Sequence, residues 1–220
     1  MKHATLVLAF TVVATISRPL YAGRGISSAR AANSASVCAF DSIAQSIGVL
    51  TLRNYAKTDT VRILNDDASP WYTFTFYYDD SDGKWDYPNP EFQPRGFHPD
   101  YFLLALDVVQ VRADTFVVVV NDSTGLRKRM HRSRFLQFLG WPEYILTAFS
   151  VEFSPEDNPL RVAPQPTARR LPFAREVHYH PSAVRGDWLK LRWQTNGADQ
   201  HAWIRWRAGR CLLVRLYPFA

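Results

Sequence analysis

The stretch at residues 186–216, GDWLKLRWQTNGADQHAWIRWRAGRCLLVRL, most constrains the fold because it contains two alternating aromatic segments. In the first segment, DWLKLRW, Leu189, Leu191 and Trp193 fall on one face of an extended strand, and Trp188 falls on the other. The second segment, AWIRWR, repeats the alternation. We therefore expect two β-strands, each with one apolar and one amphipathic face.

The polar residues 194–201 separate these two strands and contain an Asn-Gly pair. This arrangement predicts a β-hairpin with a long loop. A turn at 208–209 leads into a last, nearly all-apolar strand at 211–216, which is expected to be buried on both faces. Three short strands in succession indicate a small barrel.

Three segments of this region carry a family resemblance: NPLRVAP at 158–164, GDWLKL at 186–191 and AWIRW at 202–206. In this order and spacing they resemble a bacterial SH3-like domain, and the resemblance covers residues 158–217, with Ala202 where the family usually has glycine. The resemblance implies a small barrel whose groove recognises peptides or cell-wall fragments. It does not imply a catalytic site.

The same alternation predicts one exposed tryptophan on each of the two strands. Exposed aromatic rings beside cationic side chains are suited to stacking on a peptide or a sugar and to pairing with carboxylates. The alternative is that the tryptophans fill the barrel and cover its ends, which would favour a purely structural domain. The predicted ligand-binding residues are Trp188, Trp203, Arg161, Lys190, Arg205 and Arg207.

The front part of the chain is also rich in strand patterns, and a short helix is predicted at 41–50. Residues 114–132 have the layout of a second hairpin, which suggests a divergent SH3-like module. Pro142 and Glu143 are suited to the first turn of a short helix. Strands are predicted at 60–64, 71–78, 101–111 and 116–120.

The domain organisation follows from these patterns. A β-rich N-terminal domain is expected at 40–153, a linker at 154–159 and an SH3-like barrel at 158–220. The fold class is mainly β: a small SH3-like barrel at the C-terminus, preceded by a β-rich, divergent SH3-like domain.

A basic tip and an apolar run at residues 4–16 predict a signal peptide at 1–31, with the cleavage point left open between 23 and 36. The run is short for a membrane span, which needs about 20 residues, although an uncleaved anchor is the alternative. We therefore expect a secreted or periplasmic protein with no membrane span after cleavage. Four of the 26 basic residues precede the mature chain and no acidic residue does, which leaves 22 basic residues against 20 acidic ones. This balance argues against nucleic-acid binding.

Cys38 and Cys211 are the only cysteines. In an oxidising compartment they are able to form one disulfide across a very long loop. The alternative is that Cys211 is a small buried apolar residue of its strand.

No nucleophile motif is recognisable, and neither cysteine lies beside a histidine motif. His178, His180 and His201 form the one histidine cluster, but no further ligand lies at a diagnostic spacing, so neither a metal nor a cofactor is predicted. The favoured function is a non-catalytic binding or assembly module, whose partner is a cell-wall peptide or an envelope protein. A second hypothesis is an extracytoplasmic hydrolase or metal-dependent enzyme, whose site would combine His98 with Asp79, Asp80, Asp82 or Asp86.

Overall fold

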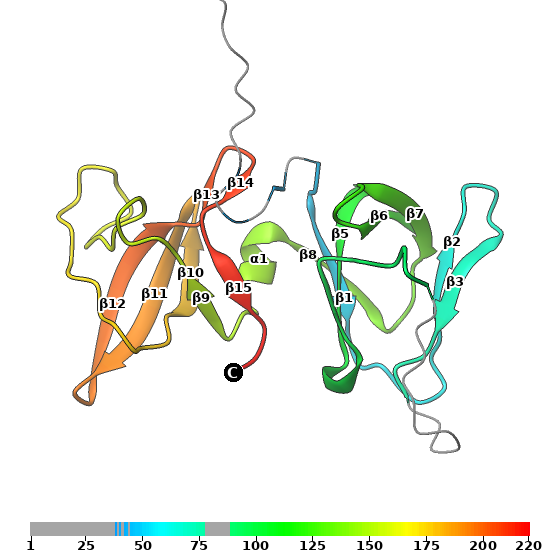
Figure 1. The fold of residues 1–220 in the computed structure, drawn as a ribbon, viewed down its shortest axis with the longest axis horizontal. Coiled ribbons are helices and arrows are strands. Elements are labelled where there is room, and N and C mark those ends of the chain that lie inside the picture. The colour runs from blue at the N-terminus through cyan, green and yellow to red at the C-terminus, as the bar shows by residue number, and fades with distance from the viewer. Residues whose placement is uncertain (1–37, 39, 41, 44, 78–88) are drawn as a thin grey trace, which may run out of the picture. The chain divides into compact units, whose positions relative to one another are not determined.

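The structure is a computed structural model that describes residues 38, 40, 42–43, 45–77 and 89–220. The predicted signal peptide and the acidic turn at 79–84 lie outside the described residues. Val37–Ala220 forms one compact unit. Antiparallel sheets dominate it, so the prediction of a mainly β protein is confirmed (Figure 1). No helix of the described part is both long and apolar enough to cross a membrane.

The front part of the chain forms an eight-stranded antiparallel sheet with the order β3-β2-β7-β6-β5-β1-β8, and β4 pairs with β5. The strands predicted at 60–64 and 116–120 are confirmed to within one residue. The strand predicted at 101–111 begins two residues later, because a 3₁₀ turn at Pro99–Tyr101 precedes it. The strands are β1 (Gly48–Leu52), β2 (Val61–Leu64), β3 (Pro70–Phe74), β4 (Gly96–His98), β5 (Leu103–Val111), β6 (Thr115–Asn121), β7 (Leu126–His131) and β8 (Leu136–Gly140).

The helix predicted at 41–50 is wrong where the structure describes it, since β1 occupies Gly48–Leu52. The physical reason is that both faces of β1 are buried. Val49 packs into one hydrophobic cluster and Leu50 into another, and neither side chain is exposed. A strand that is covered on both faces shows no alternation of polar and apolar residues, so its sequence resembles a buried helix segment.

Gly48 allows β1 and β8 to approach closely. A Cβ atom at this position would lie 2.2 Å from the backbone oxygen of Leu139, a distance that backbone movement alone can relieve. Gly48→Ala is therefore expected to lower the free energy of unfolding by about 2–3 kcal/mol, the cost of overpacking a core. Urea denaturation of the two proteins measures the difference, and a loss below about 0.5 kcal/mol would contradict the close approach.

One short helix, α1 (Trp141–Ile145), follows β8, and its beginning is as predicted. Pro142 occupies the first turn, and the Glu143 carboxylate accepts a hydrogen bond from the Gly140 backbone N–H at 2.8 Å. This contact satisfies one of the donors that a helix start leaves unpaired. Strand β9 (Ser150–Glu152) begins soon after the helix.

The C-terminal part contains a three-stranded sheet in the order β10-β11-β12 (Figure 1). The long loop predicted at 194–201 is wrong, because β11 and β12 continue until only Asn196 and Gly197 separate them. These residues have φ values of 51° and 77°, which a two-residue hairpin turn of this kind requires. The strands are β10 (His180–Arg185), β11 (Trp188–Thr195), β12 (Ala198–Arg205), β13 (Arg207–Ala208), β14 (Cys211–Leu212) and β15 (Arg215–Tyr217).

The single last strand predicted at 211–216 is wrong as well. It is divided into β14, which pairs with β13, and β15, which pairs with β9. Only Leu212 and Val214 of this stretch are buried, so it is not covered on both faces. Among the described residues the pairings form separate sheets and no closed barrel.

The predicted linker at 154–159 is packed against the C-terminal strands. The buried Asn158 side chain accepts a hydrogen bond from the Arg205 N–H at 2.9 Å and donates one to the Arg205 carbonyl at 2.7 Å. One hydrophobic cluster contains Trp141 from the predicted N-terminal domain and Trp206 from the predicted barrel. A shared core therefore joins the two predicted domains, whose boundary stays a prediction.

Candidate functional site

One face of the three-stranded sheet brings five of the six predicted ligand-binding residues together. Residues directly opposite each other on antiparallel strands share a face, and Trp203 of β12 lies opposite Lys190 of β11 and Arg161. In the neighbouring row, Trp188 lies opposite Arg205. We call these five residues, Arg161, Trp188, Lys190, Trp203 and Arg205, the tryptophan face.

The alternation read from the sequence correctly predicts which tryptophans point inward. Trp206 is fully buried and Trp193 is 6% exposed, whereas Trp188 and Trp203 are half-buried. The inward residues belong to the hydrophobic core that also holds Ile204. One partly exposed indole ring therefore remains on each of the two strands.

Arg207 does not belong to the tryptophan face. It lies on β13, where its guanidinium stacks on the Trp206 ring at 4.7 Å and its Nε donates to the Asp187 carboxylate at 2.7 Å. The same carboxylate lies 3.8 Å from the Arg205 guanidinium. Asp187 therefore neutralises part of the positive charge at this end of the sheet.

Two other cations of the tryptophan face, Lys190 and Arg161, are not neutralised by a carboxylate that the structure describes. Lys190 makes no ion pair among the described residues, and the Arg161 guanidinium donates to the neutral Ala168 carbonyl at 2.8 Å. Arg192 and Arg185 extend the face, since Arg192 follows Lys190 on the same side of β11 and Arg185 lies opposite Trp188. The prediction omitted both arginines. Strand alternation was sufficient to find Arg192, but Arg185 required the pairing of β10 with β11.

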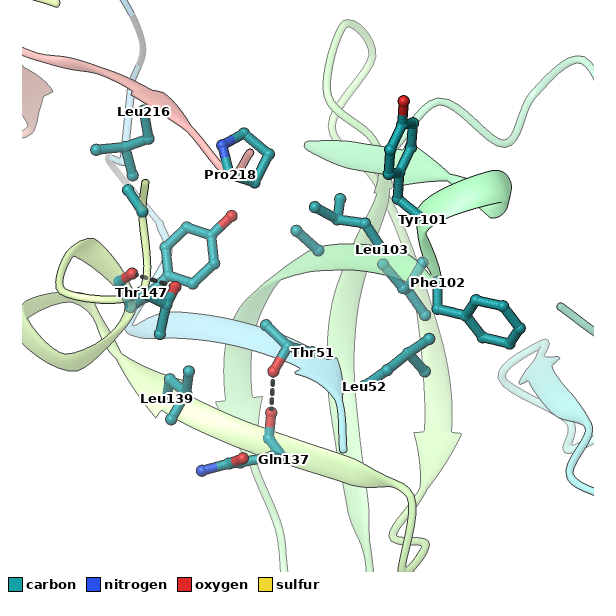
Figure 2. A pocket seen from close by; sticks show the side chains of 14 residues that line it. Thr51, Leu52, Tyr101, Phe102, Leu103, Gln137, Leu139, Thr147, Leu216 and Pro218 are labelled. Atoms are coloured by element: carbon teal, nitrogen blue, oxygen red, sulfur yellow. Dashed lines mark hydrogen bonds between the residues drawn. The ribbon is translucent and has the colours of Figure 1, made fainter. Parts of the chain in front are cut away.

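A second candidate site is a cavity of about 320 Å³ between the front sheet and the C-terminal strand. Figure 2 shows Tyr101, Phe102 and Leu103 approaching it from one side and Leu216 and Pro218 from another. Phe102 adopts the left-handed conformation with φ 51°, which is unusual for a bulky side chain and is typical of functional or strained positions. Sequence patterns did not predict this cavity, because its walls come from segments that are far apart in the chain.

Tyr144 also lines this cavity, and burial raises the pKa of its hydroxyl to about 12. A folded-state pKa above the unfolded value means that the contribution to stability is complete below pH 10 and is lost as the pH rises through 12. We expect one tyrosine to ionise near pH 12 in an absorbance titration at 295 nm, and Tyr144→Phe to remove that step. A titration in which Tyr144→Phe instead removes a step near pH 10 would show that the hydroxyl is solvated.

The structure joins Cys38 and Cys211 in a disulfide, with their Cα atoms 5.1 Å apart. It pins the chain segment at residue 38 to β14, where Ser42 also forms a bridge with Cys211. The pairing that the sequence left open is thus present in the structure.

The histidine cluster is not assembled as a metal site. His180 Nδ1 lies 2.6 Å from the Phe149 carbonyl oxygen, and the exposed His201 lies on β12 opposite Arg192. In the described ranges no three His, Cys, Asp or Glu side chains are grouped to hold a metal ion. Asp79, Asp80, Asp82 and Asp86 lie outside the described residues, so the proposed pairing with His98 stays a prediction.

Comparisons with protein-family models, with curated proteins and with solved structures found no match for this chain. The resemblance to an SH3-like domain therefore stays a prediction that depends on residues 158–217.

Proposed function

We propose that this protein is an exported, non-catalytic binding module that recognises a peptide or a cell-wall fragment through the tryptophan face. The proposed ligand carries a carboxylate and an apolar or sugar surface. Trp188 and Trp203 provide the stacking surfaces, and Lys190 and Arg161 provide the cations.

The observation that carries this proposal is the register of β11 and β12. It places Trp203 directly between Lys190 and Arg161, and it places Trp188 in the next row of the same face. An indole ring flanked by two cations without carboxylate partners is an arrangement that an anionic, partly apolar ligand would complete. The partial exposure of both tryptophans favours ligand binding over a purely structural role.

Two observations support the proposed location outside the cytoplasm. The N-terminal pattern is typical of a signal peptide, and the structure contains the Cys38–Cys211 disulfide. Disulfides persist mainly in oxidising compartments such as the periplasm and the extracellular space. The proposed partner, a cell-wall peptide or an envelope protein, is accessible there.

The proposal is tested by titrating soluble cell-wall fragments into the protein without its signal peptide, with tryptophan fluorescence as the readout. We expect saturable binding that Trp203→Ala weakens about 10- to 30-fold, the effect typical of a central aromatic contact. Lys190→Gln is expected to weaken it about tenfold, because a charge-assisted hydrogen bond is lost.

Trp71→Phe is the matched control, since this partly buried tryptophan lies in the front sheet and not on the tryptophan face. It is expected to leave the affinity unchanged. Absence of saturable binding to muropeptides and to cell-wall glycans, or equal weakening by Trp71→Phe and Trp203→Ala, would overturn the proposal.

A further inference from the structure

A basic hollow lies on the outer side of β5, β6 and β7, on elements that the tryptophan face does not use. Its volume is about 510 Å³. The buried side chains Phe116, Val118 and Val120 point to the other side of β6, into the core of the front part. The residues lining the hollow are Gln45, Asp66, Val109, Gln110, Arg112, Val117, Arg127, Lys128 and Arg129.

The strand register concentrates positive charge in this hollow. Arg127 and Arg129 are two residues apart on β7, so both point to the same side of the sheet. Arg129 lies opposite Val117 of β6, and Arg127 lies opposite Val119. Arg112 follows the end of β5, beside Gln110, which also lies opposite Val117. Three arginines thus line the hollow together with Val109 and Val117.

Neutral oxygen atoms hold two of these cations in place. Two nitrogens of Arg112 donate to the Gln110 side-chain oxygen: Nε at 3.2 Å and a terminal nitrogen at 3.0 Å. The Arg129 guanidinium donates to the backbone carbonyls of Asn65 and Asp66. These contacts orient the side chains without neutralising them.

Carboxylates neutralise little of the positive charge in the hollow. Asp66 is its one lining acid, and the Asp66 carboxylate lies 3.9 Å from Arg129 Nε with a side chain that is fully exposed. A pair at this distance in solvent contributes little. Arg127 is exposed and makes no ion pair within the described part of the chain. Oriented cations without counter-charges destabilise a fold through mutual repulsion, which a bound anion would relieve.

We propose that this hollow binds phosphate-class oxyanions, with Arg112, Arg127 and Arg129 as the binding residues. The planar guanidinium group matches two oxygens of a phosphate at once, and several such groups around one space are suited to a multiply charged anion. The anion is either a free phosphate or a phosphate group of a polymer. This site is independent of the tryptophan face and of its carboxylate-bearing ligand.

The test is calorimetric titration of the protein at low ionic strength with inorganic phosphate and, in a separate arm, with long-chain polyphosphate. We expect saturable binding of at least one of them, weakened about tenfold by Arg127→Gln and by Arg112→Gln. Asp66→Asn is expected to strengthen binding several-fold, because it removes the nearby negative charge. Binding is also expected to weaken as sodium chloride is raised.

Arg62→Gln is the matched control, because this exposed arginine lies on β2 of the same sheet and does not line the hollow. It loses the same charge and is expected to bind as the unsubstituted protein does. Binding of polyphosphate alone would assign the site to a polymer, and binding of both would assign it to the phosphate group itself. Failure of both anions to bind, or equal weakening by Arg62→Gln and Arg127→Gln, would overturn the proposal.

Discussion

Trp206→Ala is expected to lower the free energy of unfolding by about 3–5 kcal/mol, the range measured for removing a fully buried large aromatic side chain. Trp206 has no exposed surface and belongs to the cluster that joins the front part to the C-terminal strands. Its indole N–H donates to the Gly186 carbonyl at 2.8 Å, so the substitution also leaves that oxygen without its partner. Urea denaturation monitored by circular dichroism measures the loss.

Two further variants separate the contributions to this effect. Trp206→Phe keeps most of the packing but loses the hydrogen bond, and it is expected to cost about 1–2 kcal/mol. Trp203→Ala changes the opposite face of the same region, and it is expected to cost about 1–2 kcal/mol because Trp203 is half-buried. Equal losses for Trp203→Ala and Trp206→Ala would contradict the assignment of inward and outward faces.

A second large loss of stability is expected when the buried ion pair of Arg95 with Asp107 is broken. The Arg95 Nε donates to one carboxylate oxygen at 2.5 Å, and a terminal nitrogen donates to the other at 2.8 Å. The two side chains are 10% and 8% exposed, and the guanidinium also stacks on the Trp141 ring at 4.9 Å. Asp107→Ala is therefore expected to cost about 3–5 kcal/mol, because it removes the carboxylate that two nitrogens of the buried Arg95 guanidinium contact. The measurement is again urea denaturation.

The double variant Arg95→Met with Asp107→Leu distinguishes charge from packing. It removes both charges and keeps the volume, so it is expected to recover most of the stability that Asp107→Ala loses. If the double variant were as unstable as the sum of the single variants, the two side chains would not act as a pair, and the account of the ion pair would be wrong.

Local alternation predicted the strands that have one buried face. Leu189, Leu191 and Trp193 are buried as expected. These predictions succeeded because a side-chain period of two residues follows directly from strand geometry. The helix start at Pro142 was likewise readable from local chemistry.

Features that depend on tertiary pairing were not predictable from local patterns. The β1 segment resembles a helix because both of its faces are covered. The polar ends of β11 and β12 resemble a loop because the hairpin projects into solvent, although Asn196-Gly197 was a sufficient signal for a two-residue turn. The pairing of β15 with β9 joins segments more than 60 residues apart, and no local pattern specifies such a partner.

The candidate site was predicted in part for the same reason. Trp188, Lys190 and Trp203 were found because alternation within a hairpin determines which side chains share a face. Arg207 lies on the next strand, β13, where its guanidinium pairs with Asp187, so its place among the ligand-binding residues stays a prediction. The cavity beside Phe102 and the basic hollow are assembled from several strands, so only the structure reveals them.

Backbone amide chemical-shift mapping would locate the bound ligand on the protein. The isotopically labelled protein without residues 1–31, the predicted signal peptide, would be titrated with a soluble muropeptide that carries a free carboxylate. We expect saturable shifts centred on Arg161, Trp188, Lys190 and Trp203, with the cavity residues around Phe102 unchanged. Shifts centred on the cavity, or no saturable shift at the tryptophan face, would contradict the proposed function.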